Sequence, residues 1–351
     1  MKVAPVHHAL ASDSHFSVKL LHTGQHYDSS LSDQLITELS LPAPYCNFNV
    51  GSGSHAQQTA KVLTRYEDFL REDRPDLCIV PGDVNSTLAC ALAAAKLNVP
   101  VAHLEAGLRS FDRTMPEEIN RILTDQMSSI LWSPSKDADN NLLAEGIPQE
   151  KISRVGNCMI DSLVSLLPSI RKREVWRQFA LRPQEYCVVT LHRPSNVDNH
   201  ERLVAITDKL CILAESVRIV FPMHPRTRAN LKRADLFAQL DGHHSIILTG
   251  PLGYLDFLSL VESAKAVVTD SGGIQEETSY LNIPCLTLRP NTERPITRSL
   301  GTNRLTEPDI LLKSYDAAVA TSRTDMKAIP LWDGKAGMRI AEDLQRRMND
   351  L

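Results

Sequence analysis

Charged side chains follow several short apolar runs of this sequence, at points where a buried strand would end. They are Asp83 after "LCIVPG", Glu105 and Arg109 after "VAHL", and His192 and Arg193 after "VVTL". The carboxyl ends of parallel strands share one edge of a sheet, where open α/β proteins bind ligands. Carboxylates at that edge could transfer protons, and guanidinium groups could bind an anion. Taken singly, Asp83 could instead cap the next helix, and Arg109 could be a surface salt-bridge partner.

The stretch "VVTDSGGIQEETS", residues 267–279, predicts a strand that ends at Asp270 and a helix that begins after two glycines. The Ser-Gly-Gly turn would let backbone N–H groups approach an anion closely, with the positive end of the helix dipole behind them. Glu276 and Glu277 would lie in the first helical turn, where acids are favoured and could also bind a sugar hydroxyl. An ordinary tight turn is the alternative interpretation of these residues.

A second segment, "SFDRTMPEEINRILTD", predicts a helix that begins at Pro116. Arg121 comes four residues after Glu117, on the same helical face. These residues could form an ion pair on an exposed helix, or a carboxylate–guanidinium unit that faces a cleft. In the second interpretation Asp83, Glu105 and Glu117 supply three carboxylates for proton transfer.

Short apolar runs alternate with amphipathic stretches along almost the whole chain. The expected strands are residues 18–24, 77–83, 99–107, 130–135, 187–193, 218–225, 245–251, 266–273 and 283–290, and the clearest helices are 54–73 and 85–98. Apolar strands separated by helices favour parallel sheets covered on both faces. We therefore expect an α/β protein with two doubly wound, Rossmann-like domains.

Composition narrows the possible partners. The chain has 351 residues, which favours two domains, and a net charge of −4, which gives no support for a nucleic-acid or membrane partner. No apolar run approaches the roughly 20 residues of a membrane span, and the N-terminus lacks the apolar core of a secretory signal.

The seven cysteines form no CxxC pair, and Cys78, Cys187 and Cys285 lie in apolar runs. We expect buried thiols in a reducing cytoplasm. No Cys/His cluster predicts a metal, and the "GSGSH" stretch at residues 51–55 is no dinucleotide fingerprint, so neither a metal nor a nicotinamide cofactor is expected.

An ordered set of motifs then carries a resemblance that spans essentially the whole chain. The motifs are "GDVNSTLA", "HLEAGLRS", "MPEEINR", "VGNCMID", "TLHRPSN", "TDSGGIQEE" and "NTERP". In this order they resemble the non-hydrolysing UDP-N-acetylglucosamine 2-epimerases. The resemblance implies a glycosyltransferase-B-like fold, with the nucleotide sugar in a cleft between the two domains. It also implies a homodimer and a role in supplying surface polysaccharide precursors.

The implied domains are an N-terminal one, residues 1–167 completed by a C-terminal helix at 335–351, and a UDP-binding one, residues 168–334. The implied reaction interconverts UDP-GlcNAc and UDP-ManNAc. A base removes the C2 proton while UDP leaves C1, giving 2-acetamidoglucal, and UDP adds again after protonation of the opposite face. No cofactor takes part.

Roles follow from the resemblance position by position. The acid/base carboxylates correspond to Asp83, Glu105 and Glu117, with His192 placed to assist the departure of UDP. Glu277 corresponds to a ribose contact and Phe257 to the aromatic residue that packs on uracil, although Phe257 could also be helix core. The remaining substrate-binding positions are Lys2, Arg109, Arg121, Arg193, Ser271, Gly272, Gly273 and Arg294.

Three departures from the family pattern bear on these expectations. The chain begins with the helix that follows the first strand in relatives, so we expect the N-terminal domain to lack that strand. The segment "QHYDSSLSD", residues 25–33, lacks the glutamine-rich pattern that some relatives use for a regulatory second UDP-GlcNAc. "HPRTR" at His224 replaces a His-x-Asn-Pro pattern.

Four alternatives remain open from the sequence. Water could intercept the same intermediate in a hydrolysing epimerase, which releases UDP and ManNAc. An epimerase of a modified UDP-sugar, such as a UDP-diacetamido-glucuronate, would share the fold and the chemistry. A glycosyltransferase would not need three carboxylates at strand ends. A nucleotide-sugar binder without catalysis is the fourth.

Overall fold

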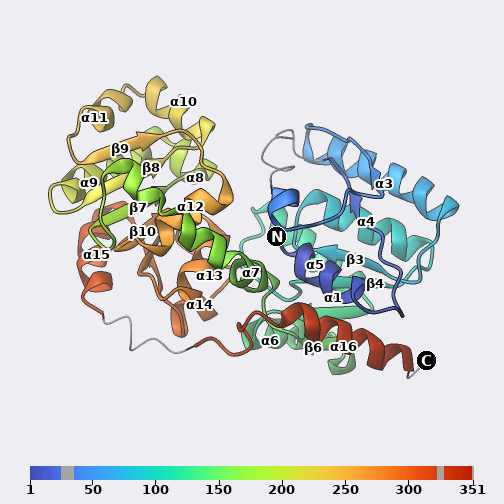
Figure 1. Ribbon diagram of the computed structural model, residues 1–351. Helices are drawn as coiled ribbons and strands as arrows, with labels where there is room; N and C mark the ends of the chain where they lie inside the picture. The colour runs from blue at the N-terminus through green and yellow to red at the C-terminus, as the bar shows by residue number, and fades with distance from the viewer. Residues whose placement is uncertain (25–34, 322–327, 350–351) are drawn as a thin grey trace. The chain divides into compact units, whose positions relative to one another are not determined.

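The computed structural model describes residues 1–24, 35–321 and 328–349, and the chain divides into two compact units (Figure 1). Unit 1 comprises Met1–Ser165 and Pro330–Leu351, and unit 2 comprises Leu166–Ile329. The domain limits given by the resemblance stay a prediction. The "QHYDSSLSD" segment lies outside the described residues.

Unit 1 is built from short parallel strands and the helices between them. Its strands are β1 (Leu21–His22), β2 (Cys46–Asn47), β3 (Cys78–Pro81), β4 (Val101–Leu104), β5 (Ile130–Ser133) and β6 (Ile152–Arg154). Its helices are α1 (Val3–Ala11), α3 (His55–Glu72), α4 (Asn85–Lys96), α5 (Pro116–Met127), α6 (Lys136–Ala144), the 3-10 turn η1 (Gln149–Lys151), α16 (Ala336–Asn349) and the first part of α7 (Cys158–Arg173).

The described strands of unit 1 pair in two groups. One is a four-stranded parallel sheet in the order β3-β4-β5-β6, and the other is the parallel pair β1-β2. Four strands expected in this part of the chain are confirmed as β1, β3, β4 and β5. The very short β2 and β6 were not anticipated, because two or three residues carry no apolar run. The expectation that a first strand is lacking stays a prediction.

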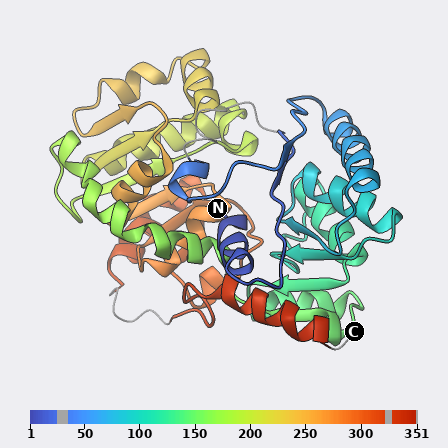
Figure 2. The ribbon, with the colours of Figure 1, turned by 45° about the vertical axis from the view of Figure 1, so that its right-hand side comes forward.

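The C-terminal helix packs on unit 1, beside α1 (Figures 1 and 2). Val6 and Leu10 of α1 share an apolar cluster with Ile340 and Leu344 of α16. The indole Nε1–H of the fully buried Trp132 donates to Asp343 of α16 over 2.9 Å. Residues more than 300 positions apart in the chain therefore cover one face of the same sheet.

Unit 2 has longer, almost uninterrupted apolar strands. They are β7 (Tyr186–Thr190), β8 (Arg218–Pro222), β9 (Ile246–Thr249), β10 (Ala266–Thr269), β11 (Cys285–Leu288) and β12 (Asn303–Thr306). The helices are α8 (Pro194–Val197), α9 (His200–Ala214), α10 (Pro225–Arg233), α11 (Phe237–Asp241), α12 (Tyr254–Glu262), α13 (Gly272–Tyr280), α14 (Ile296–Ser299) and α15 (Leu311–Val319), with 3-10 turns η2 (Val175–Phe179) and η3 (Pro308–Ile310).

Within the described residues, the unit 2 strands form one parallel sheet in the order β12-β11-β10-β7-β8-β9. This is the doubly wound order of a Rossmann fold, so the fold class expected from the sequence is confirmed. The strand order reverses at the neighbouring strands β7 and β10, which pair in parallel from Cys187 to Thr190 of β7. A crevice for a ligand is expected beyond the carboxyl ends of these two strands.

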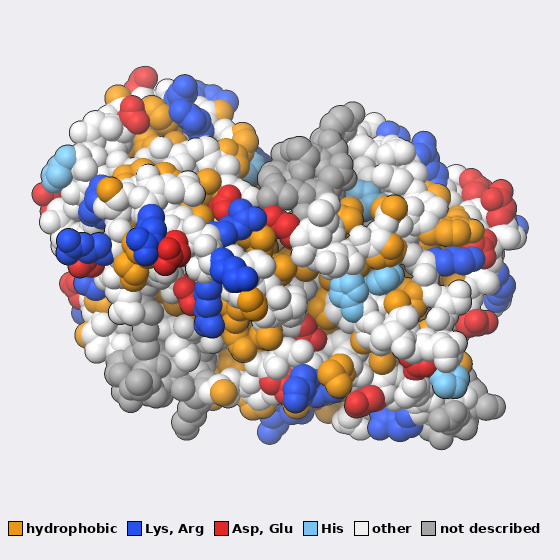
Figure 3. All heavy atoms as spheres, in the orientation of Figure 1, with side chains coloured by type: hydrophobic (Ala, Val, Ile, Leu, Met, Phe, Trp, Pro, Cys, Tyr) orange, Lys and Arg blue, Asp and Glu red, His pale blue; other side chains and the backbone are white. Residues whose placement is uncertain are grey.

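The distribution of surface charges and the state of the cysteines match the expectations from composition. Acidic and basic side chains are interspersed on the face drawn in Figure 3. Cys78, Cys187 and Cys285 are buried, as expected, and every cysteine is a free thiol. In the part of the chain that the structure describes, no helix combines the length and apolar character needed to cross a membrane.

Candidate functional site

In unit 1, helix α5 begins beside the loop that follows β4. Met115 is extended, Pro116 is the first helical residue, and two acids follow it in the first turn. Glu118 is fully buried and accepts hydrogen bonds of 2.9 Å from the Ser110 N–H, the Ser110 hydroxyl and the Phe111 N–H. Glu118 thus attaches the loop to the helix.

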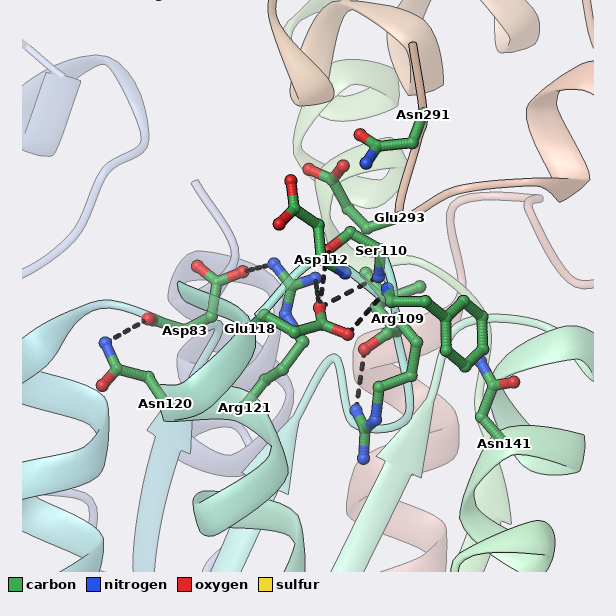
Figure 4. A network of polar contacts seen from close by, with 12 residues as sticks. Asp83, Arg109, Ser110, Asp112, Glu118, Asn120, Arg121, Asn141, Asn291 and Glu293 are labelled. Atoms are coloured by element: carbon green, nitrogen blue, oxygen red, sulfur yellow. Dashed lines mark hydrogen bonds and ion pairs between the residues drawn. The ribbon is translucent and has the colours of Figure 1, made fainter. Parts of the chain in front are cut away.

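Arg121 joins α5 to the end of β3. Its guanidinium forms ion pairs with Asp83 and with Glu118, the latter at 2.9 Å, and lies between the two carboxylates in Figure 4. The Glu117–Arg121 pair considered from the sequence is therefore wrong, since Arg121 turns to the acid three residues before it. Asp83 is not a helix cap either, because Val84 occupies that position in α4.

Glu117 differs from the other acids of this region. Its side chain is half-buried, and it makes no hydrogen bond or ion pair with any described residue. An unpaired carboxylate held at a helix start is available to accept or donate a proton. In unit 1 this is the property that the proposed acid/base role requires.

Glu105 follows β4 and has a backbone in the left-handed region, with φ of 76°. Its buried carboxylate forms an ion pair with Lys2, the residue that precedes α1. Gly82, at the end of β3, has φ of 66°, and a Cβ there would lie 2.9 Å from Lys2 Nζ. A glycine at this position therefore leaves room for the Lys2–Glu105 pair.

Arg109 is buried, so its interpretation as a surface salt-bridge partner is wrong. Its Nη2 lies 2.7 Å from Asp125 and 2.6 Å from Glu145, and Nη1–H donates to the Leu108 carbonyl. Burial alone would lower the pKa of Arg109, but Glu145 and Asp125 outweigh it and raise the pKa. Its donors are thus directed at protein acceptors in this structure.

In unit 2, the switch point between β7 and β10 is organised by Asp270. This fully buried carboxylate accepts from the N–H groups of His192 and Arg193 and from the Asn196 amide, at 3.0–3.1 Å. Burial alone would raise the pKa of Asp270, but His192 and Asn196 lower it overall. Asp270 therefore fixes the loop that carries His192.

The His192 side chain is half-exposed and directed by this carboxylate. Its Nδ1 lies 2.9 Å from Oδ1 of Asp270, and Nε2 has no partner among the described residues. The ring of His224 lies 6.2 Å away, centroid to centroid. Burial, followed by the neighbouring His192, lowers the pKa of His224. The His192–Asp270 pair leaves one ring nitrogen available for a ligand.

Helix α13 begins at Gly272, directly after Ser271, so the glycines lie inside the first turn. The expectation that Glu276 and Glu277 occupy that turn is wrong, and they lie in the second turn. Ser271 makes no side-chain cap, and no acid stands in the first turn. A Cβ at Gly272 would lie 2.7 Å from Nη1 of Arg294. The same Cβ would lie 3.0 Å from Oε1 of Glu293, so the paired Arg294 and Glu293 flank a helix start whose own first turn carries no acid.

Three arginines of unit 2 gather around one acid. Buried Glu293 lies 2.7 Å from Arg294 and 2.9 Å from Arg289, and 3.7 Å from Arg193. Burial alone would raise the pKa of Glu293, but Arg294 and Arg289 lower it well below its usual range. Arg294 also contacts Glu276 at 2.9 Å. The cluster concentrates positive charge beside the start of α13.

Glu277 is buried, and the Tyr254 hydroxyl donates to it over 2.8 Å. Burial raises the pKa of Glu277 to about 8, an effect that Tyr254 reduces and Glu276 increases. Hydroxyl donors of a ligand would stabilise the ionised form of this carboxylate. Phe257, on α12 with Tyr254, is half-buried and therefore keeps some exposed ring surface.

The structure places the sequence-derived residues in two groups. In unit 1, ion pairs or short loops connect Lys2, Asp83, Glu105, Arg121 and the start of α5 with Glu117. In unit 2, His192, Arg193, Ser271, Gly272, Gly273 and Arg294 surround the β7/β10 switch point, and Phe257 and Glu277 belong to the α12 and α13 helices. No cluster of three metal-binding side chains occurs among the described residues.

Sequence reasoning missed several buried polar residues that shape these groups. They are His103, Asp125, Asn196 and Glu293. One signal was available: a histidine inside the apolar strand "VAHL" must find partners in the interior. Asp125 lies seven residues, two helical turns, after Glu118, which also places both on one face of α5.

Comparison with known proteins gives a consistent result. The model of the UDP-N-acetylglucosamine 2-epimerase family matches residues 8–345. The crystal structure of the UDP-GlcNAc 2-epimerase of Methanocaldococcus jannaschii, in complex with UDP-GlcNAc and UDP, is 43% identical, with a TM-score of 0.90. The similarity covers 98% of this chain and 96% of that chain.

Two further relatives extend the comparison. The UDP-GlcNAc 2-epimerase of Neisseria meningitidis, solved bound to UDP-GlcNAc, is 30% identical with a TM-score of 0.88, over 98% of this chain and 96% of that one. The UDP-2,3-diacetamido-2,3-dideoxy-D-glucuronate 2-epimerase of Pseudomonas aeruginosa is 37% identical, over 99% of this chain and 96% of that protein. The chain therefore belongs to the UDP-N-acetylglucosamine 2-epimerase family.

Proposed function

We propose that this protein interconverts UDP-GlcNAc and UDP-ManNAc by inverting the configuration at C2 of the sugar. Elimination breaks the C2–H and C1–O bonds and gives 2-acetamidoglucal and UDP. Addition then forms the C1–O bond again, and a proton enters C2 from the opposite face. The reaction is redox-neutral and needs no co-reactant other than exchangeable protons.

The groups of unit 2 suit the nucleotide part of the substrate. N–H groups at the start of α13 and the cations Arg193 and Arg294 would bind the diphosphate. His192, oriented by Asp270, would donate from Nε2 to the departing UDP oxygen and take the proton back on addition. Glu277 would accept hydrogen bonds from ribose hydroxyls, and Phe257 would pack on uracil.

The carboxylates of unit 1 suit the proton transfers at C2. Asp83 is paired with Arg121 and Glu105 with Lys2, whereas Glu117 has no partner among the described residues. This unpaired, half-buried carboxylate is the observation that carries the proposal. Inversion needs one group on each face of C2, and we assign the proton transfers to Glu117 together with Asp83 and Glu105.

The test is to incubate the protein with UDP-GlcNAc in D₂O and to follow the C2 position by proton NMR. We expect UDP-ManNAc to form with deuterium at C2, since the proton added in the second half-reaction comes from solvent. The matched control is Glu117→Gln, which removes the acid/base group and keeps the side-chain shape. Absence of both exchange and UDP-ManNAc with the unaltered protein would contradict the proposal.

Product analysis in the same experiment separates two reaction types. We propose the non-hydrolysing type, in which UDP stays bound and adds back to the glycal. Accumulation of free UDP with free ManNAc in equal amounts would instead identify a hydrolysing epimerase. Formation of UDP-ManNAc at constant total UDP-sugar supports the non-hydrolysing reaction.

The Pseudomonas aeruginosa relative makes a modified sugar the second candidate substrate. A UDP-diacetamido-glucuronate differs from UDP-GlcNAc by an acetamido group at C3 and a carboxylate at C6. The ratio of kcat/KM for the two substrates measures the preference directly. A ratio above 1 for the modified sugar would replace UDP-GlcNAc as the substrate while keeping the same reaction.

The assembly and location of the protein belong to the same proposal. We expect a homodimer in the cytoplasm, as for the family, because UDP-sugars are made and used there. Light scattering of the purified protein would give the mass of the assembly, and a monomer would contradict the first expectation.

A further inference from the structure

His103 is a polar residue inside a buried strand. It belongs to β4, opposite Val80 of β3 in the parallel register, and its side chain has no exposed surface. Such a group needs partners in the protein, because an unpaired polar atom in the interior costs about 1–3 kcal/mol. The partners of His103 therefore define its role.

Both ring nitrogens of His103 contact acceptors. Nε2 lies 2.7 Å from the carbonyl oxygen of Gly82, and Nδ1 lies 2.6 Å from Oδ1 of Asp125 on α5. A carbonyl oxygen can only accept, so Nε2–H donates to Gly82. If Asp125 is ionised, it too can only accept, and the ring must then donate from both nitrogens as an imidazolium.

The charges around Asp125 favour its ionised form. Burial alone would raise the pKa of Asp125, but the contacts with His103 and Arg109 lower it overall. Arg109 is in turn paired with Glu145. With both ring nitrogens of His103 donating, two cations and two carboxylates alternate in one connected series, of which His103, Asp125 and Arg109 are buried and Glu145 is partly exposed.

Asp125 also holds the turn that carries Glu105. Its Oδ2 accepts from the Gly107 N–H at 3.1 Å and from Arg109 at 2.7 Å. Glu105 and Gly107 both have left-handed backbones, and such a conformation costs about 1–3 kcal/mol at a residue with a side chain. At Gly107 a Cβ would lie 2.4 Å from the Ala138 carbonyl oxygen. The turn therefore depends on neighbours that fix it.

The turn that carries Asp83 is held by the same helix. Asn120 of α5 donates to the Asp83 carbonyl over 2.9 Å, and Arg121 pairs with its carboxylate. His103 adds the contact to Gly82, the residue directly before Asp83. Helix α5, which itself carries Glu117, is thus attached to both of the other acid-bearing turns.

We propose that His103 is a positioning residue that links the Asp83 turn and the Glu105 turn to α5 by donating from both ring nitrogens. It acts through Gly82 and Asp125 and needs no contact with substrate. The proposal rests on the proposed function, because the placement of Asp83 and Glu105 matters for catalysis only if they take part in proton transfer.

The kinetic test compares His103→Gln and Asp125→Asn with the unaltered protein. Glutamine has both of its N–H donors on one nitrogen, so it cannot reproduce two contacts that are made from two separate ring nitrogens. We expect kcat to fall about 100-fold while KM changes by less than about threefold, because misplaced acid/base groups slow the chemistry and the UDP-binding groups lie in unit 2. Calorimetry with UDP should still give full binding stoichiometry, which distinguishes misplacement from unfolding.

The matched control is His8→Gln on α1. His8 is also a histidine whose Nε2 contacts a backbone carbonyl, that of Leu39, at 2.8 Å. It has no contact with the turns described here, so we expect unchanged kinetics. A loss in His8→Gln equal to that in His103→Gln would overturn the specific role of His103.

Two measurements test the proposal without any activity. Amide hydrogen exchange at Gly107 should be at least about tenfold faster in both site variants. Asp125→Asn replaces the acceptor of this amide, and His103→Gln removes a contact that holds the acceptor in place. NMR of protein labelled with ¹⁵N-histidine should show a proton on each ring nitrogen of His103. Unchanged exchange in the variants, or a single ring proton, would overturn the proposal even if the enzyme is inactive.

The two hypotheses fail in different ways. An unaltered protein without epimerase activity contradicts the proposed function, while exchange and NMR still decide the role of His103. An active protein whose His103→Gln variant keeps the original kcat contradicts the positioning role alone.

Discussion

The two charged regions of this protein solve different electrostatic problems. In unit 1, buried and half-buried charges neutralise one another through side chains: Lys2 with Glu105, and Arg121 with Asp83 and Glu118. In unit 2, three arginines surround Glu293 and one of them also contacts Glu276, so cations outnumber acids beside the backbone N–H groups at the start of α13. A region built for proton transfer needs fixed acids, whereas a region built for a diphosphate needs donors that remain available.

Because of this difference, we expect different kinds of substitution to be damaging in the two units. Unit 1 depends on pairs, so removing one partner leaves an uncompensated buried charge. Binding in unit 2 would depend on a ligand coming close to backbone N–H groups. Adding side-chain atoms there should therefore weaken binding more than removing a charged partner. Three predictions test this contrast.

The largest changes in kcat and in stability are expected from substituting the two adjacent acids of α5, Glu117 and Glu118. Glu117→Gln should lower kcat by about 10³-fold, within the range for loss of an acid/base group. The free energy of unfolding should change by less than about 0.5 kcal/mol, because Glu117 contacts no described polar partner. Rates and urea denaturation of the same preparation measure both quantities.

Glu118→Gln is the matched variant one residue along the helix. It weakens three hydrogen bonds and an ion pair with Arg121, so we expect a loss of about 3 kcal/mol of unfolding free energy. Equal destabilisation by the two variants would show that Glu117 is structural and would remove the contrast on which its assignment depends.

A smaller effect is expected from Gly272→Ala. The added Cβ would lie 2.7 Å from Arg294 and 3.0 Å from Glu293, so it displaces a cation and narrows the approach to α13. We expect the Kd for UDP to rise about tenfold, equivalent to about 1.4 kcal/mol. Gly250→Ala, where a Cβ meets open space, is the control, and titration calorimetry is the measurement. Equal affinities for UDP in all three proteins would exclude α13 as the diphosphate site.

The smallest effect concerns pH and Glu277. Its folded pKa of about 8 lies above the ordinary value of 4.5. The unfolded chain therefore releases this proton first as pH rises, and the contribution of Glu277 to stability is lost between those two values. Relative to Glu277→Gln, the unaltered protein should lose at least about 2 °C of Tm across that interval. A Tm difference that is independent of pH would show that Glu277 is ionised in the folded protein.

The sequence predicted the strands whose apolar runs were four residues or longer. It missed β2, β6 and β12 because the first two have no apolar run and "NRLT" of β12 contains a single apolar residue. It also placed the start of α13 too late, because glycines were treated as helix breakers. A helix can begin on glycines when an extended residue such as Ser271 precedes them.

For the site, the residue types at strand ends predicted which residues lie near one another, but not which acid and which base form ion pairs. Arg121 can reach acids three or four residues earlier almost equally well, and only the fold decides that Glu118 is its partner. The contact between His103 and Asp125 joins a strand to a helix 22 residues later. No local sequence pattern predicts a contact between residues so far apart in the chain, so only the three-dimensional structure reveals it.

Because Glu117 has no polar partner among the described residues, substitution of this residue alone could remove nearly all activity of a family member without affecting its fold. A descendant that changed this residue alone would keep every described hydrogen bond and ion pair of unit 1, and its nucleotide-binding groups as well. Under the proposed assignment it would fold, bind UDP and retain the "HLEAGLRS" and "TDSGGIQEE" signatures, yet turn over substrate about 10³-fold more slowly. If Glu117 has the proposed acid/base role, the identity of the first acid after Pro116 separates active members of the family from inactive ones.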